Sequence, residues 1–148
     1  MNVAVLRHFA SGALTAAALL LAATPSAAQP APDALAMHRW ELVTWNGAPP
    51  PDGIGRDLEI YFTASRGFVA SGYAGCNTYR AQLTIEAKAM RFADIVSVTR
   101  KGCPGEYGRM EQRYKDALAA VERFTLAGEK LILEGRNVKL EFAAKPLR

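Results

Sequence analysis

The stretch RFTLAGEKLILEGRNVKLEF, residues 123–142, decides the fold class. Apolar and polar residues alternate in its three short runs, which is the pattern of half-buried strands. The runs are separated by Ala127-Gly128-Glu129 and by Gly135-Arg136-Asn137, two short segments typical of turns. Three strands joined by three-residue turns form an antiparallel meander. The end of the chain is therefore predicted to be β-sheet.

Further short runs toward the N-terminus show the same strand character. These runs are Trp40 to Trp45, Leu58 to Phe62, Phe68 to Ala70, Leu83 to Ile85 and Met90 to Val98. The total is about eight short strands. Because strands and helices do not alternate as in βαβ units, we expect a mainly β (α+β) fold with a mostly antiparallel sheet, curled or closed around its apolar face.

Residues 106–121 change to a helical period. Their apolar residues recur at intervals of three and four and form one stripe, namely Tyr107, Met110, Tyr114, Ala117, Leu118 and Val121. We interpret this stripe as the side that faces the core. The acidic residues of the segment, Glu106, Glu111, Asp116 and Glu122, are expected on a solvated face. Glu111 and Lys115 stand four apart, in the order that favours a helix-surface ion pair.

The first 28 residues have the layout of a secretory signal peptide. A short start with Arg7 precedes an apolar run from Ala13 to Ala23, and small residues follow it up to Ala28. The run is about half of the ~20 residues that span a bilayer, which argues against a membrane anchor. We therefore expect cleavage after Ala28, no stable membrane insertion afterwards and a periplasmic or secreted protein. Residues 29–37 are predicted to be a flexible lead-in, and residues 38–144 the folded domain.

Cys76 and Cys103 are the two cysteines of the chain. An even pair in an exported protein usually forms a disulfide. In the chain-entropy model, closing the loop between them stabilises the fold by about 3–4 kcal/mol. Two free buried thiols, a redox couple, or a Cys–His pair with His38 are the alternatives.

Charge and motifs favour neither a nucleic-acid-binding protein nor an enzyme. The net charge of +4 is scattered and forms no basic helix face. His38 is the single histidine after residue 28, and no Cys-x-x-Cys pair, Gly-x-Ser-x-Gly elbow or phosphate-binding loop occurs in the sequence. We expect no metal, no cofactor and no catalytic residues.

Several motifs in a fixed order carry a family resemblance. They are Trp40-Glu41-Leu42, Asn46-Gly47, Gly72 to Tyr79, Thr99 to Cys103, a helix with Glu111 and Leu118, and Phe124 and Leu126 before Gly128 to Leu133. This order resembles the META domain, also called the HslJ-like family, over about residues 38–143. The motif residues are Gly75, Cys76, Asn77, Tyr79, Thr99 and Cys103.

The resemblance implies a half-barrel-like sheet in a secreted or periplasmic bacterial protein linked with stress tolerance, with no established enzymatic activity. We expect a monomer that binds an envelope protein or a small apolar ligand, with the concave sheet as the binding surface. A hydrolase or redox enzyme using Cys76 and Cys103 is the alternative, and a factor that shields other envelope proteins is a third possibility.

The motif also has a physical interpretation. Gly75 suits a tight bend that brings Cys76 toward Cys103, and the Asn77 side chain can bond nearby backbone to hold that bend. We expect a structural corner at the start of the strand from Tyr79 to Ile85. The functional alternative is that Asn77 and Thr99 line a ligand site.

Export and the disulfide are testable together by intact mass spectrometry of the protein purified from the periplasm of a bacterial host. We expect the mass of the chain starting at Gln29, lighter by two hydrogens before reduction than after it. Two alkylatable thiols without reductant would refute the Cys76–Cys103 bond and reopen cysteine chemistry.

Overall fold

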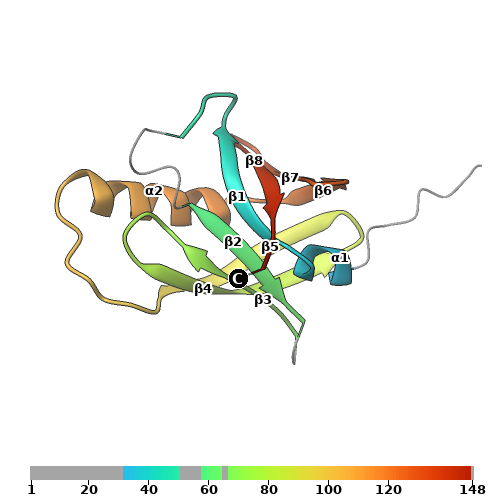
Figure 1. Cartoon of the computed structure of the whole chain (residues 1–148), viewed down its shortest axis with the longest axis horizontal. Coiled ribbons are helices and arrows are strands. Elements are labelled where there is room, and N and C mark those ends of the chain that lie inside the picture. Colours follow the sequence, from blue (N-terminus) through green and yellow to red (C-terminus); the bar gives the residue numbers. More distant parts are fainter. Residues whose placement is uncertain (1–31, 51–57, 65–66, 148) are drawn as a thin grey trace, which may run out of the picture.

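A computed structural model describes residues 32–50, 58–64 and 67–147. The predicted signal peptide, its cleavage site after Ala28 and residues 29–31 of the lead-in lie outside these residues. Figure 1 shows a curled sheet with helices α1 and α2 on opposite sides of the view.

The described residues form eight strands and two helices. The strands are β1 (Arg39–Trp45), β2 (Glu59–Thr63), β3 (Phe68–Tyr73), β4 (Thr78–Glu86), β5 (Ala89–Ser97), β6 (Arg123–Ala127), β7 (Lys130–Gly135) and β8 (Val138–Lys145). The helices are α1 (Pro32–Ala36) and α2 (Glu106–Ala119). The predicted strands and the predicted helix are confirmed, although α2 ends two residues before the expected Val121.

The strands pair in sequence order, and every pair is antiparallel. The order returns from β8 to β1, where Leu42 lies opposite Phe142. Within the described stretch 67–147, however, β5 and β6 share a single residue pair, Ala89 with Arg123. The sheet is therefore curled and not a true barrel, which confirms the predicted fold class.

Helix α2 covers the edge of β5 that does not pair with β6. The chain between α2 and β6 crosses β5 at its first residues, where Met90 N donates to Glu122 O over 3.1 Å. Beyond that crossing, α2 packs against β5 (Figure 1). A helix laid over the unpaired edge of a strand is one of the ways in which proteins protect a sheet edge.

A bulge in β5 sets which of its side chains face inward. The register shifts between Arg80 and Gln82, and Asp94 on the opposite strand has a φ of 49°. An extra residue in one strand moves the following side chains to the other face. Ser97 is consequently paired with Tyr79, whose side chain is buried, and turns toward α2.

Large apolar side chains fill the concave side of the sheet. The largest of those with less than 2% exposure are Trp40, Tyr79, Tyr114, Phe142, Leu35, Leu58, Ile60, Met90, Leu118, Leu131, Leu133 and Leu140. They come from both helices and from most strands, so one core joins all elements. Burial of this apolar surface is the main stabilising contribution to the fold.

The start of the domain differs from the sequence prediction. Residues 32–36, expected within a flexible lead-in, form α1, and the Leu35 side chain is fully buried. The indole Nε1 of Trp40 donates to the Leu35 carbonyl oxygen over 2.9 Å. A buried leucine and a buried hydrogen bond tie this short helix to the core, so the ordered domain begins before His38.

Among the described residues, the helices are too short or too polar to qualify as membrane-spanning segments.

A substitution of Gly135 tests the contact between the end of α2 and the C-terminal meander. A Cβ atom on residue 135 would overlap the carbonyl oxygen of Ala120, which directly follows α2. We expect Gly135→Ala to destabilise the protein by roughly 1–3 kcal/mol in chemical denaturation, because the helix end would have to move. Gly102→Ala is the matched control, since a Cβ there meets nothing within 4 Å. Equal stability of both variants would contradict this role of Gly135.

Candidate functional site

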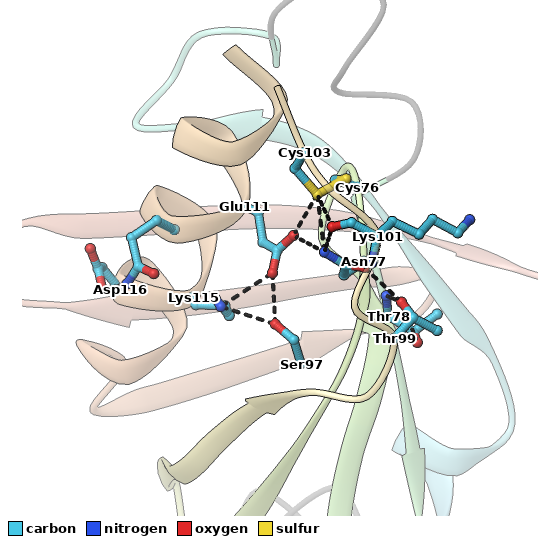
Figure 2. A network of polar contacts seen from close by, with 11 residues as sticks. Cys76, Asn77, Thr78, Ser97, Thr99, Lys101, Cys103, Glu111, Lys115 and Asp116 are labelled. Carbon is cyan, nitrogen blue, oxygen red and sulfur yellow. Dashed lines mark hydrogen bonds and ion pairs between the residues drawn. A yellow bond between two sulfur atoms is a disulfide. The ribbon is translucent and has the colours of Figure 1, made fainter. Parts of the chain in front are cut away.

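Polar side chains meet where the start of β4, the segment after β5 and helix α2 come together. Figure 2 shows Asn77 from the β4 side and Glu111 from the helix pointing toward one another, with the two cysteines beside them. We call this group the Asn77–Glu111 network; its members are Cys76, Asn77, Thr78, Ser97, Thr99, Lys101, Cys103, Glu111 and Lys115.

The predicted cysteines form a disulfide. Cys76 and Cys103 have their Cα atoms 6.1 Å apart, and the bond links the bend before β4 to the segment that leads into α2. Gly75 precedes the pair with a φ of 91°, a conformation that favours glycine. The Glu111 carboxylate lies close to both sulfurs. Because the sulfurs are bonded to each other, they are not available as thiolate ligands for a metal.

Asn77 uses both ends of its amide inside the protein. Its Oδ1 accepts from the backbone N of Lys101 over 2.8 Å and from Thr99 Oγ1 over 2.9 Å. Its Nδ2 donates to Glu111 Oε2 over 2.9 Å and lies 3.0 Å from Cys103 Sγ. The side chain, which is 6% exposed, therefore joins the corner before β4 to the segment after β5 and to the helix.

The other motif residues also have protein partners. Thr99 Oγ1 accepts from the backbone N of Thr78 over 3.1 Å while it donates to Asn77. The Tyr79 ring packs edge-on against Tyr114, with centroids 5.8 Å apart, and its hydroxyl donates to the Glu59 carbonyl over 3.3 Å. Burial raises the pKa of Tyr79 well above 10.0. The motif residues thus hold three chain segments together.

Glu111 is a buried carboxylate at the centre of the network. Its Oε1 accepts from Ser97 Oγ over 2.7 Å and from Lys115 Nζ over 3.2 Å. Burial alone would raise its pKa, but the hydrogen bonds from Ser97, Asn77 and Lys115 and the charge of Lys115 together lower the pKa below 4.5. The carboxylate is held in its ionised form.

The position of Glu111 corrects the sequence prediction of a solvated face. The expected ion pair with Lys115 is present, but Glu111 is only 7% exposed. A signal was available in the sequence, because Glu111 stands three residues before Tyr114 and seven before Leu118, on the apolar stripe of the helix. A carboxylate on such a stripe must be hydrogen-bonded or ion-paired when it is buried.

A second group of residues forms an open cleft along the second half of α2. Its volume is about 270 Å³, and its lining residues are Trp45, Arg113, Asp116, Ala117, Ala120, Asn137 and Val138. We call it the Trp45 cleft. It lies between the end of β1, the second half of α2 and the β7–β8 turn. No sequence pattern points to this cleft, because its three segments are far apart in the chain.

One charged side chain of the Trp45 cleft, Arg113, lies against its aromatic wall. The guanidinium carbon of Arg113 lies 5.5 Å from the centre of the Trp45 ring, a cation–π arrangement. The Trp45 ring is in turn edge-on to Tyr114, with centroids 6.2 Å apart. Asp116 Oδ1 accepts from Gln112 Nε2 over 2.8 Å.

The two groups have different chemical capacities. In the Asn77–Glu111 network, both ends of the Asn77 amide and both oxygens of the Glu111 carboxylate already have protein partners. This arrangement stabilises the fold by joining α2 to the sheet. The Trp45 cleft instead offers a charged and an aromatic side chain beside open space, which are the components of a small binding site.

Comparisons with known proteins agree with this architecture. The family model described as the META domain matches residues 33–146. No curated protein matches the sequence at a significant level.

Three solved structures have the same fold. An NMR structure from Burkholderia xenovorans has a TM-score of 0.60 and 21% identity, covering 95% of this chain and 99% of that one. A second NMR structure has a TM-score of 0.59 and 20% identity, with coverages of 76% and 93%. A crystal structure of a DUF4847 family protein from Bacteroides vulgatus has a TM-score of 0.56 and 16% identity, with coverages of 78% and 98%.

Because the pKa of Glu111 is lowered in the folded state, the stability of the protein should depend on pH through this residue. A carboxyl group whose pKa is lower in the folded state stabilises the fold above its unfolded pKa, and this contribution is lost as the pH falls through the folded pKa. We expect Glu111→Gln to cost about 1–3 kcal/mol at neutral pH, because an amide brings a donor to positions where donors already stand. The difference from the wild type should narrow below pH 4.5.

Chemical denaturation from pH 3 to pH 7 would measure this difference. Glu106→Gln is the control, since Glu106 lies on the same helix, is 78% exposed and is 4.0 Å from Arg109. Its effect should stay within about 0.5 kcal/mol at every pH. A constant gap between the wild type and Glu111→Gln across the range would rule out the titration of Glu111 as its source.

Proposed function

The chain belongs to the META domain family, and on that premise we propose that it is a non-catalytic protein of the bacterial envelope that acts by binding. Its role would be in stress tolerance, as the family resemblance implies. The protein would work in the periplasm or outside the cell. The signal-peptide pattern of residues 1–28 and the Cys76–Cys103 disulfide both support this location.

The Trp45 cleft is the observation that carries the binding proposal. The sequence suggested the concave side of the sheet as the binding surface, but that side is filled by side chains such as Trp40 and Phe142, both fully buried. Binding there would require the core to open. The cleft needs no such rearrangement, and its wall contains Trp45 and Arg113, residue types that are enriched in binding hot spots.

The state of the cysteines supports a non-catalytic role. The alternative enzyme would use Cys76 or Cys103 as a nucleophile or as a redox pair. A nucleophilic cysteine needs a thiolate, and here both sulfurs belong to the disulfide. The nearby carboxylate of Glu111 is hydrogen-bonded on both oxygens and ionised, which suits a structural role better than proton transfer.

Binding can be tested by two-dimensional NMR of the oxidised, isotope-labelled protein. A periplasmic extract would be divided into a low-mass fraction and a macromolecular fraction, and each would be added in turn. We expect signal shifts at the Trp45 indole and at residues 113–120 with at least one fraction. The shifts at residues 113–120 should disappear in Trp45→Leu, and all the shifts should persist in Tyr61→Leu, a control at an exposed aromatic residue outside the cleft.

The same spectra can contradict the proposal in two ways. Shifts that appear only away from the cleft, or no shifts with either fraction, would reject the Trp45 cleft as the binding site. Time-dependent conversion of an added compound, abolished by reducing and alkylating the cysteines, would support the enzyme instead.

A further inference from the structure

The two charged side chains of the Trp45 cleft are not paired with each other. Arg113 lies against Trp45, and across the described ranges 32–50, 58–64 and 67–147 no carboxylate comes within 4.0 Å of its guanidinium. Asp116 stands one helical turn further along, on the same side of α2. Its Oδ1 accepts from Gln112, which leaves Oδ2 without a partner among the described residues. The cleft therefore presents a positive and a negative group side by side.

The end of α2 adds to this separation of charge. The helix ends at Ala119, and Ala120 forms its C-cap and lines the cleft. The C-terminus of a helix carries a partial negative charge that attracts cations. The cleft thus runs from a cationic end at Arg113 to an anionic end at Asp116 and the helix terminus.

Small and apolar side chains lie between these polar groups. Ala117 and Val138 are buried and, with Ala120, form the hollow beside the indole of Trp45. The volume of about 270 Å³ is just below the usual range for drug-sized ligands, roughly 300–1,000 Å³. An occupant must be small, and part of its surface should be apolar.

We propose that the Trp45 cleft binds a small zwitterion with an apolar side chain, of the size of a free amino acid or a dipeptide. The carboxylate of the ligand would accept hydrogen bonds from the Arg113 guanidinium, and its ammonium group would lie near Asp116 and the end of α2. The apolar part would cover Ala117 and Val138. This inference rests on the proposed function, because it names the ligand class of the same cleft.

The charge pattern argues against simpler ligands. An anion without an amine would bring its charge close to Asp116, and a cation without a carboxylate would meet Arg113. A purely apolar molecule would cover both charged groups and leave them without partners, which is costly. A zwitterion pairs each group with its opposite.

Leucine and its two truncated analogues test the proposal by isothermal titration calorimetry. 4-Methylpentanoate keeps the carboxylate and lacks the amine, whereas 3-methylbutylamine keeps the amine and lacks the carboxylate. Leucyl-glycine extends the series to a dipeptide. We expect leucine or leucyl-glycine to bind at least roughly tenfold more tightly than either analogue, since each analogue loses one charge-assisted contact.

Two exposed-site variants assign the contacts. Arg113→Gln should abolish the preference for leucine over the amine, and Asp116→Asn should abolish the preference for leucine over the acid. Arg109→Gln is the matched control, because Arg109 lies on the same helix outside the cleft. Its affinities should equal those of the wild type. Thermal unfolding of each variant would show that the fold is retained, and Trp45 fluorescence gives a second readout of binding, since Trp40 is fully buried.

The outcomes separate this inference from the proposed function. Equal affinity for leucine and both analogues, or no binding of any probe, would overturn the zwitterion proposal. If the extract fractions still shift the Trp45 signal, the cleft binds another class of ligand and the proposed function stands. If neither the probes nor the extracts affect the cleft, both proposals fail.

Discussion

The hydrogen bond from Asn77 to Glu111 connects the part of the structure that the sheet cannot complete by itself. The strands follow one another in order, but β5 and β6 meet at one residue pair, so α2 has to cover the remaining edge of β5. An apolar stripe alone would let the helix slide along that edge. A buried carboxylate that must be satisfied has few allowed positions, and it finds its partners in Asn77, Ser97 and Lys115.

Two further features support this contact. The bulge at Asp94 turns Ser97 toward the helix, so the carboxylate has a donor from β5. The disulfide ties the corner before β4 to the segment that leads into α2. This covalent link lowers the entropy cost of ordering that segment, which the network requires. Backbone geometry, a covalent bond and a buried charge thus all help to hold α2 in position.

The same helix links the network to the Trp45 cleft. Glu111 faces the sheet, and Arg113 and Asp116, which lie within two turns of it, face the cleft. Tyr114 lies between them, with its ring against both Tyr79 and Trp45. The position of the helix therefore determines how far apart the charges of the cleft and its aromatic wall lie. If the Trp45 cleft binds a ligand as proposed, the family motif would matter for binding although its residues do not line the cleft.

Sequence patterns were sufficient for the features that depend on local periodicity or on covalent pairing. Alternation indicated the strands, a period of three to four residues indicated α2, and two cysteines in a chain with a predicted export signal indicated the disulfide. They failed for α1, because five residues are too few to show a period and the helix is held by the burial of Leu35. Glu111 was assigned to a solvated face because charged residues are usually exposed.

The Trp45 cleft could not be predicted from the sequence because its parts are far apart in the chain. The Trp45 cleft combines the end of β1, the second half of α2 and the β7–β8 turn, and none of these carries a recognisable motif alone. The positions of the strands, helix α2 and the pairing of the two cysteines follow from the sequence by itself, because each is a property of neighbouring residues or of a unique pair. The open β5 edge, the buried state of Glu111 and the cleft were decided only by the tertiary structure, since packing alone brings their parts together.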